Sequence, residues 1–283
     1  MKFSKMHGIG NNYIYVETKN LGVHENDLAS LAIAVSNVNT GIGSDGLITI
    51  GSSQTGDFRM RIFNEDGSEG ENCGNGLRCV GKYVYDKGLT TKTQLVVETK
   101  AGLMHLTLHV DASTNTVEEV TVDMGEPRFL REQIPVLSGN PDEMALHDSL
   151  EIDGKAMTFT AISMGNPHAI FFVDDVDAID VAQIGPKIEH HPFFPQRVNV
   201  EFIAQKGKHE LDFRVWERGS GITQACGTGA CASVVASVLT DRVQKGEEIL
   251  VHLLGGDLRI TYHENGHVFM RGPAAFICHG EWL

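Results

Sequence analysis

Apolar and polar positions along the chain follow the period of β-strands over most of its length. Short apolar and β-branched runs, bounded by Gly, Asn or Asp, predict strands. Residues 27–36 and 181–190 instead have the apolar spacing of amphipathic helices, which would cover the outside of the protein. The clearest predicted strands are 47–50, 94–98, 103–110, 117–123, 202–204, 249–254 and 258–262.

Two further segments of helical length, residues 76–85 and 229–239, are apolar on almost every side. A helix without a polar face has to be enclosed by other elements. Because predicted strands surround both segments, we expect an α/β (α+β) fold in which each half is a curled mixed β-sheet wrapped around a central helix. Residues 127–148 form a poorly patterned connection.

The two halves of the sequence carry the same motifs in the same order, at an offset of about 150 residues, which indicates a duplicated domain. SKMHGIGNNYIYV matches ISMGNPHAIFFV, RIFNEDGS matches RVWERGSG, and CGNGLRC matches CGTGAC. No Pro-rich linker separates the halves, so we expect them to pack closely and form a cleft. The duplication pairs Asn11 with Asn166, Glu65 with Glu217 and Cys73 with Cys226.

Composition and charge narrow the possible partners. The formal net charge is −14, with 23 basic residues spread along 283 positions, which disfavours binding to nucleic acid or to an anionic membrane. No apolar run approaches the roughly 20 residues that cross a bilayer, and the first residues lack the apolar stretch of a secretory signal. We therefore expect a cytoplasmic protein in which the five cysteines remain thiols.

Cys73 and Cys226 each precede a Gly-x-Gly sequence that opens a helical segment. The amino terminus of a helix offers unpaired N–H groups and a positive dipole end, which suit the charge that develops when an amino acid loses its α-proton. The same dipole lowers a thiol pKa, so one cysteine would act as a thiolate base and the other as a thiol acid. The expected oxyanion site uses the amides of Gly74, Asn75, Gly227 and Thr228.

A single intracellular cysteine is most often a small buried apolar residue. We apply that interpretation to Cys79, Cys231 and Cys278, whereas the matched positions of Cys73 and Cys226 in a duplicated motif favour chemistry.

Polar residues beside the duplicated motifs suit a substrate with both ammonium and carboxylate groups. Glu217 would accept an ammonium group and Arg218 would clamp a second carboxylate, although both also fit a surface ion pair. His168, in a Gly-Asn-Pro-His turn, would orient substrate or assist proton transfer, and equally fits a capping role. Uncharged donors and acceptors come from Asn11, Asn64, Asn166 and Asn199.

The sequence offers no cofactor signature. Metal sites favour close Cys or His pairs such as C-x-x-C, which the cysteine spacings here do not supply, so we expect no metal. Residues 41–46, GIGSDG, match the dinucleotide fingerprint in their glycine spacing. A predicted strand follows them where a helix is required, and we therefore reject a nicotinamide site.

At the level of whole motifs, the chain resembles diaminopimelate epimerases. The resemblance extends from KMHGIGNNYI at the start to RGPAAFICHG near the end, and its most specific runs are FNEDGSE, CGNGLRC, MGNPHA, RVNVEFI and WERGSGITQACGTGACAS. It implies interconversion of LL- and meso-2,6-diaminopimelate on the bacterial route to lysine and peptidoglycan, without pyridoxal phosphate or metal. It also implies a homodimer, with Cys278 where some relatives place a tyrosine at the dimer contact.

The resemblance also assigns domains and residues. It implies two pseudosymmetric domains that close on the substrate, residues 1–119 with 273–283 and residues 120–272. Cys73 and Cys226 become the acid and base pair, with Glu217 and His168 assisting. The sequence departs from the family pattern at Ser44, where many relatives carry Gln, at Ile222, where a Glu is usual before Cys226, and in the run 70–72 before Cys73. The implied substrate contacts are Asn11, Ser44, Asn64, Gly74, Asn75, Asn166, Asn199, Glu217, Arg218, Gly227 and Thr228.

Two alternatives remain open. One is another two-cysteine racemase of the same fold that acts on proline or hydroxyproline. These cyclic substrates have no distal amino-carboxylate centre, so Arg218 and the four Asn residues weigh against this alternative. The other is a thiol redox protein in which Cys73 and Cys226 form a regulatory disulfide, which would leave the two carboxylate-binding turns unexplained.

Overall fold

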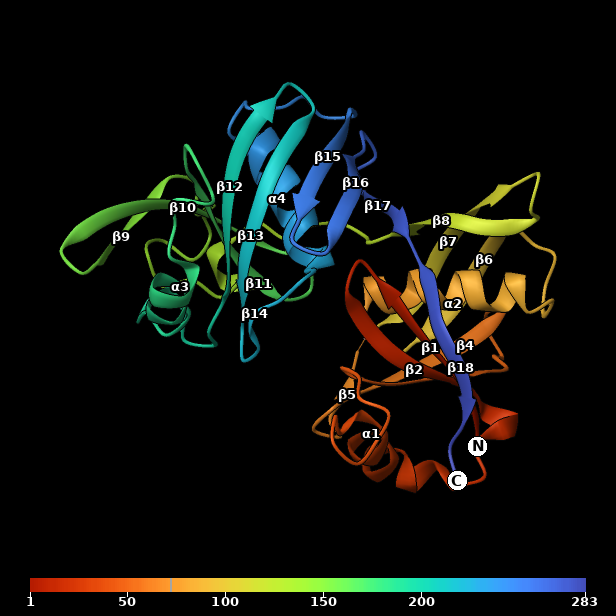
Figure 1. Cartoon of the computed structure of the whole chain (residues 1–283). Coiled ribbons are helices and arrows are strands. Elements are labelled where there is room, and N and C mark those ends of the chain that lie inside the picture. Colours follow the sequence, from red (N-terminus) through yellow and green to blue (C-terminus); the bar gives the residue numbers. More distant parts are fainter. Residues whose placement is uncertain (72) are drawn as a thin grey trace. The chain divides into compact units, whose positions relative to one another are not determined.

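The computed structural model describes residues 1–71 and 73–283, which divide into two compact units (Figure 1). Unit 1 comprises Met1–Asp123 and Arg271–Leu283, and unit 2 comprises Met124–Met270. The strand β17 (Val268–Pro273) carries the chain from unit 2 back into unit 1. Each unit has its own run of parallel and antiparallel strand pairs and its own enclosed helix.

Unit 1 is built from a run of strands that pair in the order β18, β1, β2, β3, β4, β6, β7 and β8. The pairs β2–β3 and β4–β6 are parallel and the others are antiparallel. The helices of this unit are α1 (Leu28–Ser36) and α2 (Gly74–Asp86), with short 3-10 turns at Thr18–Asn20 and Glu25–Asp27. Its strands are β1 (Lys2–Gly8), β2 (Asn11–Glu17), β3 (Gly46–Gly51), β4 (Phe58–Asn64), β5 (Glu69–Gly70), β6 (Gln94–Thr99), β7 (Gly102–Asp111), β8 (Thr116–Asp123) and β18 (Ala275–Glu281).

Unit 2 repeats this arrangement in the order β9, β10, β11, β12, β13, β15 and β16. Its helices are α3 (Val181–Glu189) and α4 (Gly227–Leu239), with a 3-10 turn at Arg131–Gln133. Its strands are β9 (Asp148–Ile152), β10 (Lys155–Ser163), β11 (Pro167–Phe172), β12 (Asn199–Gly207), β13 (Glu210–Glu217), β14 (Gly221–Ile222), β15 (Glu248–Leu253) and β16 (Gly256–Tyr262).

The directions of strand pairing confirm the duplication. From β1 to β7 the successive pairs are antiparallel, parallel, antiparallel, parallel and antiparallel. The series from β10 to β16 is the same, and the two-residue strands β5 and β14 occupy matching places beside β4 and β13. The predicted fold class, with two pseudosymmetric domains, is therefore confirmed.

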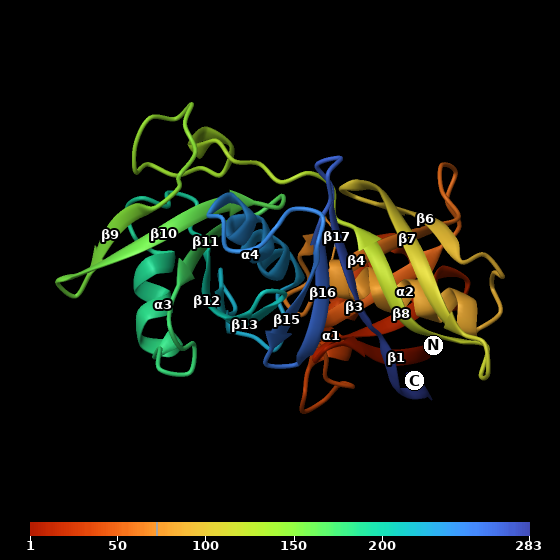
Figure 2. The ribbon, with the colours of Figure 1, turned by 90° about the horizontal axis from the view of Figure 1, so that it is seen from above.

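Strands enclose both central helices. In α4, all residues from Gly229 to Ser237 are buried, and the helix packs on β10, β11, β12 and β16. In unit 1, α2 packs against β7 and β8, and Figure 2 shows it lying beneath these strands. Full enclosure fits the lack of a polar face in α4. In α2, Arg78, Lys82 and Asp86 share one face, and Arg78 is nevertheless fully buried.

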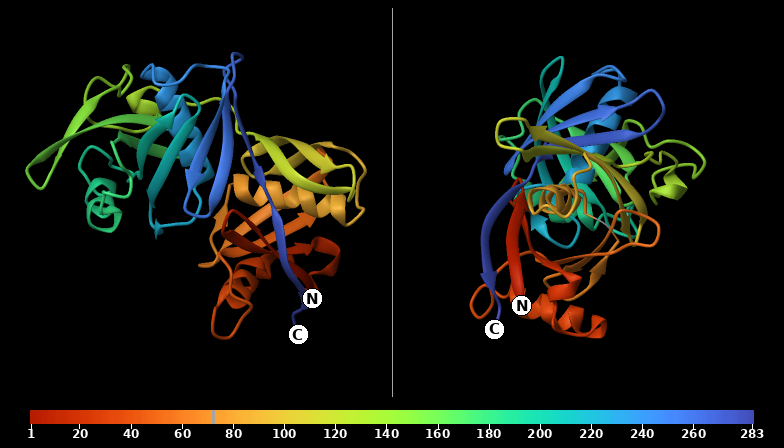
Figure 3. Two further views of the ribbon diagram at one scale, coloured as in Figure 1. Left: turned by 45° about the horizontal axis from the view of Figure 1, so that its top comes forward. Right: turned by 90° about the vertical axis from the view of Figure 1, so that its right-hand side faces the viewer.

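The outer helices bury one side each. In unit 2, α3 packs on β12 and β13, next to an apolar cluster that includes Phe159, Phe171 and Phe202. In unit 1, α1 packs on β3 and β4. The two chain ends also lie together in unit 1, as both views of Figure 3 show. There the Met1 amino group donates to the Trp282 carbonyl over 2.6 Å. Among the described residues, no helix combines the length and apolar character needed to cross a membrane.

Candidate active site

Cys73 stands immediately before α2, as its amino-terminal cap. Its backbone is extended, and its Sγ accepts a hydrogen bond from the Gly76 amide over 3.3 Å. A Cβ at Gly76 would lie 2.7 Å from Ile48 Cδ1, the end of a flexible side chain. The sulfur thus occupies the place where an anion would meet the first amides of the helix. Of the unusual run 70–72, Gly70 and Glu71 are described, whereas Asn72 lies outside the described residues.

A network of amides surrounds the Cys73 turn. Cys73 Sγ lies 3.6 Å from Asn11 Oδ1, and Asn75 Nδ2 donates to the same oxygen over 3.3 Å. Asn11 Nδ2 in turn donates to the Asp45 carboxylate over 2.7 Å. The fully buried Arg78 donates from NH1 to Asn75 Oδ1 over 2.9 Å. Asn11 and Asn75 are therefore held at the sulfur by charged residues behind them.

Two other predicted contacts lie at the start of β3 and the end of β4. Ser44 is buried, and its hydroxyl donates to the Gly46 carbonyl over 2.9 Å. Asn64 pairs with Gly46 across the sheet, and its amide donates to Ser68 Oγ over 3.0 Å. Asp45, next to Ser44, links this loop to Asn11.

Cys226 occupies the matching position before α4 but is more deeply buried, with 3% of its surface exposed. Its Sγ lies 3.7 Å from Thr228 Oγ1. Burial raises the pKa of the Cys226 thiol well above its ordinary value, and the nearby carboxyls of Glu217 and Glu201 raise it further. Hydrogen bonds from Thr228 and the Gly229 amide at the helix start lower this pKa, but burial and the acidic neighbours outweigh them. Cys226 is suited to act as a proton donor.

Glu217, at the end of β13, is the acidic neighbour that the sequence predicts. Its carboxylate accepts a short hydrogen bond from the Thr223 hydroxyl. Burial raises its pKa, and hydrogen bonds with Thr223 and Cys226 partly offset this effect. The carboxyl group is therefore close enough to influence the protonation of the sulfur.

His168 lies on β11 and is fully buried, rather than capping a turn at the surface. Its Nδ1 lies 2.6 Å from Glu201 Oε1, and its Nε2 lies 2.9 Å from Asn166 Oδ1. Asn166 Nδ2 donates to Thr228 Oγ1 over 3.3 Å. These contacts form a connected path of side chains from Glu201 to Cys226.

Glu201 is a site residue that the sequence analysis missed. It belongs to RVNVEFI, in which a single acidic residue interrupts a buried strand, and that interruption is the signal that identifies it. The fold brings one polar side-chain atom each of His168, Glu201 and Cys226 within 4.8 Å of one another.

Asn199 and Arg218 are linked through the backbone. The buried Asn199 donates to the Pro167 carbonyl over 2.9 Å and accepts from the Arg218 amide over 2.9 Å. The exposed Arg218 side chain donates from NH1 to the Gln196 carbonyl over 3.1 Å. Asn199 therefore fixes the turns that carry Asn166 and Arg218, and the Arg218 guanidinium extends to the surface.

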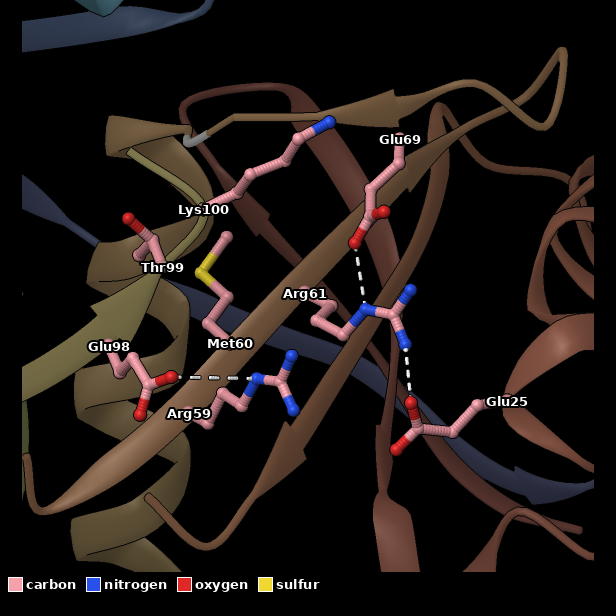
Figure 4. Close-up of a pocket in the computed structure, with 8 residues that line it drawn as sticks. All are labelled: Glu25, Arg59, Met60, Arg61, Glu69, Glu98, Thr99 and Lys100. Atoms are coloured by element: carbon pink, nitrogen blue, oxygen red, sulfur yellow. Dashed lines mark hydrogen bonds and ion pairs between the residues drawn. The ribbon is translucent and has the colours of Figure 1, made fainter. Parts of the chain in front are cut away.

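A hollow of about 400 Å³ in unit 1 lies apart from these residues (Figure 4). It is lined by three cationic side chains, two of which are already paired. Arg61 pairs with Glu69 over 2.7 Å and with Glu25 over 3.0 Å, and Arg59 lies 3.8 Å from Glu98. None of the predicted site residues lines this hollow.

Within each unit, the structure gathers predicted residues around one cysteine. In unit 1 they are Asn11, Gly74 and Asn75 around Cys73. In unit 2 they are Asn166, His168, Glu217, Gly227 and Thr228 around Cys226.

Known proteins resemble this chain over its full length. A protein named diaminopimelate epimerase from Geobacillus sp. (strain WCH70) is 52% identical to it, and the match covers 99% of this chain and 98% of the relative. A protein of the same name from Bacillus cytotoxicus is 51% identical, and the match covers 99% of this chain and 96% of the relative. A phenazine biosynthesis protein of the PhzF family from Bacillus anthracis superimposes with a TM-score of 0.70 at 17% identity, covering 100% of this chain and 99% of the other.

A hydroxyproline epimerase from Agrobacterium vitis also superimposes, with a TM-score of 0.68 at 14% identity, over 99% of this chain and 91% of the other. Likeness at such low identity concerns the fold alone. The sequence model described as diaminopimelate epimerase matches residues 3–130 and 160–277. The chain belongs to the diaminopimelate epimerase family.

Proposed function

We propose that this protein is an isomerase that interconverts LL- and meso-2,6-diaminopimelate, with one cysteine removing the α-proton and a second cysteine donating a different proton to the opposite face of the α-carbon. The observation that carries the proposal is the pair of Cys-Gly-x-Gly helix starts, one in each half of a chain that belongs to the diaminopimelate epimerase family. The reaction supplies a precursor of lysine and peptidoglycan, and we propose that it takes place in the cytoplasm.

The reaction inverts one stereocentre, which requires a base on one face of the α-carbon and an acid on the other. We propose that Cys73 and Cys226 hold these positions and exchange roles with the direction of the reaction. The raised pKa of Cys226, caused first by burial, supports its role as the thiol acid when Cys73 is the base. Loss of the α-proton places negative charge beside the substrate carboxylate.

Backbone amides at the two helix starts would stabilise that charge. Those of Gly74 and Asn75 follow Cys73, and those of Gly227 and Thr228 follow Cys226, so that both sets present N–H groups and a positive dipole end. Because such donors are fixed before the reaction begins, they need little reorganisation in the transition state.

The distal end of the substrate needs a separate site. We propose that Arg218 binds the distal carboxylate through its planar guanidinium and that Glu217 contributes to ammonium binding and to the protonation state of Cys226. His168 assists the acid–base pair. The remaining proposed substrate contacts are Asn11, Ser44, Asn64, Asn166 and Asn199.

Proline-type racemisation is the main competing activity, because a hydroxyproline epimerase shares the fold. A cyclic amino acid has no second carboxylate for Arg218 to bind. The full-length relatives at 51–52% identity are named for diaminopimelate instead.

The assay is the conversion of LL-diaminopimelate to the meso isomer under reducing conditions, with proline as a matched non-substrate. We expect turnover of the first and none of the second. Cys73→Ala and Cys226→Ala should each abolish turnover while leaving the protein folded. Cys79→Ala and Cys231→Ala, which change buried cysteines on the same two helices, serve as controls and should remain active. Near-normal turnover by either of the first two variants would exclude the two-cysteine mechanism.

We also propose a homodimer and assign the two domains to units 1 and 2. The expected domain boundaries, 119/120 and 272/273, fall within β8 and β17.

The strand β18, which carries the expected dimer contact at Cys278, pairs with β1 and exposes Ile277 and Cys278. Sedimentation of the intact protein would measure the oligomeric state, and a monomer at assay concentration would contradict the dimer.

A further inference from the structure

Glu201 is a fully buried carboxyl group on β12, and only one of its two oxygens has a hydrogen-bond partner among the described residues. Oε1 lies 2.6 Å from His168 Nδ1, whereas Oε2 is buried without a partner. The titratable groups that face it are His168 from β11, Cys226 from the start of α4 and Glu217 from the end of β13. An isolated anion is strongly disfavoured in such surroundings.

The Glu201–His168 pair therefore retains a proton. Burial raises the pKa of Glu201, while His168 acts in the opposite direction. A carboxylate beside a neutral ring would leave a net negative charge in the core, near two other acidic groups. With one further proton the pair is neutral overall, and this proton lies between Oε1 and Nδ1. The other ring nitrogen, Nε2, then carries its own hydrogen.

With Nε2 protonated, donor and acceptor are fixed in each hydrogen bond between His168 and Cys226. Nε2 donates to Asn166 Oδ1 over 2.9 Å, which leaves the Asn166 amide nitrogen to donate to Thr228 Oγ1 over 3.3 Å. Having accepted that bond, the Thr228 hydroxyl points its hydrogen towards Cys226 Sγ, 3.7 Å away. A hydroxyl donor at this place stabilises the thiolate that forms when Cys226 gives up its proton.

The Glu201 carboxyl group also packs tightly against the start of α4. A Cβ added at Gly229 would lie 2.7 Å from Glu201 Oε1 and 3.1 Å from Cys226 Sγ. At the matching glycine of unit 1, Gly76, the nearest atom is Ile48 Cδ1. The buried acid is therefore a feature of the Cys226 half of the duplication, where unit 1 has an aliphatic side chain.

We propose that Glu201 is a positioning residue for Cys226, which holds His168 with Nε2 as a donor and thereby fixes the hydrogen bonds that reach the sulfur through Asn166 and Thr228. This inference rests on the proposed function because Cys226 is one of its two acid–base groups. Glu201 acts through His168 and does not itself contact the substrate.

The first test is independent of activity. In protein labelled with ¹⁵N in its histidine rings, the His168 signals are assigned as those missing from His168→Gln. We expect Nε2 of the wild-type ring to carry a proton. In Glu201→Leu, the ring should be neutral, with one nitrogen free of hydrogen. A wild-type ring whose Nε2 lacks a proton, or an unchanged ring in Glu201→Leu, would overturn the proposal.

The second test is kinetic and uses two substitutions. We expect Glu201→Leu to lower kcat about 100-fold with little change in KM, less than the roughly 10⁴-fold loss that follows when a directly catalytic histidine loses its carboxylate partner. Because the equilibrium constant is fixed, kcat/KM falls equally in both directions. Glu201→Gln should lose about tenfold, since its amide can donate to Nδ1 and preserve the Nε2 hydrogen. This variant also serves as the test if the Leu protein does not fold.

Glu210→Gln is the matched control. Glu210 also contacts a histidine in unit 2, His252, over 2.7 Å, but both side chains are partly exposed on β13 and β15. Wild-type kinetics are expected for this variant. A loss confined to KM in Glu201→Leu, or equal losses in the Gln and Leu variants, would contradict the positioning role. If wild-type protein fails to epimerise diaminopimelate while the ring signals are as expected, the proposed function fails and the assignment of the Glu201–His168 pair stands.

Discussion

Gly76 and Gly229 occupy the same position in the two central helices, and replacing each with Ala would compare the two cysteine turns. At Gly76, the added methyl would lie 2.7 Å from Ile48 Cδ1 and 3.1 Å from Met60 Cε, the ends of flexible side chains. At Gly229 it would meet Glu201 Oε1 at 2.7 Å, Cys226 Sγ at 3.1 Å and Phe213 Cζ at 3.2 Å. Only the first set of neighbours moves easily.

The expected magnitudes follow from these neighbours. Both substitutions gain about 1 kcal/mol of helix propensity, and overpacking costs about 1–3 kcal/mol. Gly76→Ala should therefore change the free energy of unfolding by about 1 kcal/mol or less, whereas Gly229→Ala should destabilise by about 2 kcal/mol. To reach an ordinary contact of 3.4 Å, Glu201 Oε1 has to shift by about 0.7 Å, and the sulfur by a smaller amount. Misplacement on the order of 1 Å can cost about 100-fold in rate.

Urea unfolding and steady-state epimerisation would measure both effects. We expect kcat/KM to fall about 100-fold in Gly229→Ala and by no more than about tenfold in Gly76→Ala. Equal activities in the two variants, with both proteins folded, would refute the view that the start of α4 is tightly packed around reacting groups.

Two further predictions concern stability. Arg131 and Asp148 form a largely buried ion pair at 2.7 Å, so Asp148→Asn should lower the free energy of unfolding by about 3 kcal/mol in urea titrations, and an unchanged midpoint would contradict this expectation. Burial raises the pKa of Cys79 to about 11, so its thiol adds stability below its unfolded-state pKa, and this stability is lost as the pH rises towards 11. The difference in unfolding free energy between wild type and Cys79→Ala should shrink by about 1.4 kcal/mol per pH unit in that interval, and a constant difference would show that the thiol titrates normally.

Local patterns predicted the elements that depend on local sequence. The apolar segment 229–239 is the body of α4, and the predicted helix at 27–36 corresponds to α1 at Leu28–Ser36. The strands predicted at 94–98 and 249–254 correspond to β6 and β15 within one residue at each end. Enclosure of α4 also followed from its sequence alone, because it has no polar face. In α2, Arg78 is buried through hydrogen bonds to Asn75 and Pro273 that its sequence does not reveal.

The environment of Cys226 depends on contacts that no local pattern contains. His168 and Glu201 are 33 residues apart, and the parallel pairing of β11 with β12 places His168 opposite Asn199, two residues from Glu201 on the same face of the strand. The same long-range packing buries the sulfur beside two acids, and this burial reverses the expected direction of its pKa shift. Helix termini are visible in a sequence, whereas the burial that competes with them is set by the whole fold.

The most direct test of the two-cysteine account is the position of deuterium early in the reaction. LL-diaminopimelate is incubated with the enzyme in D₂O, and substrate and product are separated and analysed by mass spectrometry at low conversion. A proton removed by one thiolate returns to the same face as hydrogen, whereas the opposite thiol delivers deuterium from solvent. We predict deuterium on the inverted α-carbon of the meso product and hydrogen in the remaining LL substrate. Deuterium entering the remaining substrate as fast as the product, or a product that keeps its hydrogen, would contradict the account.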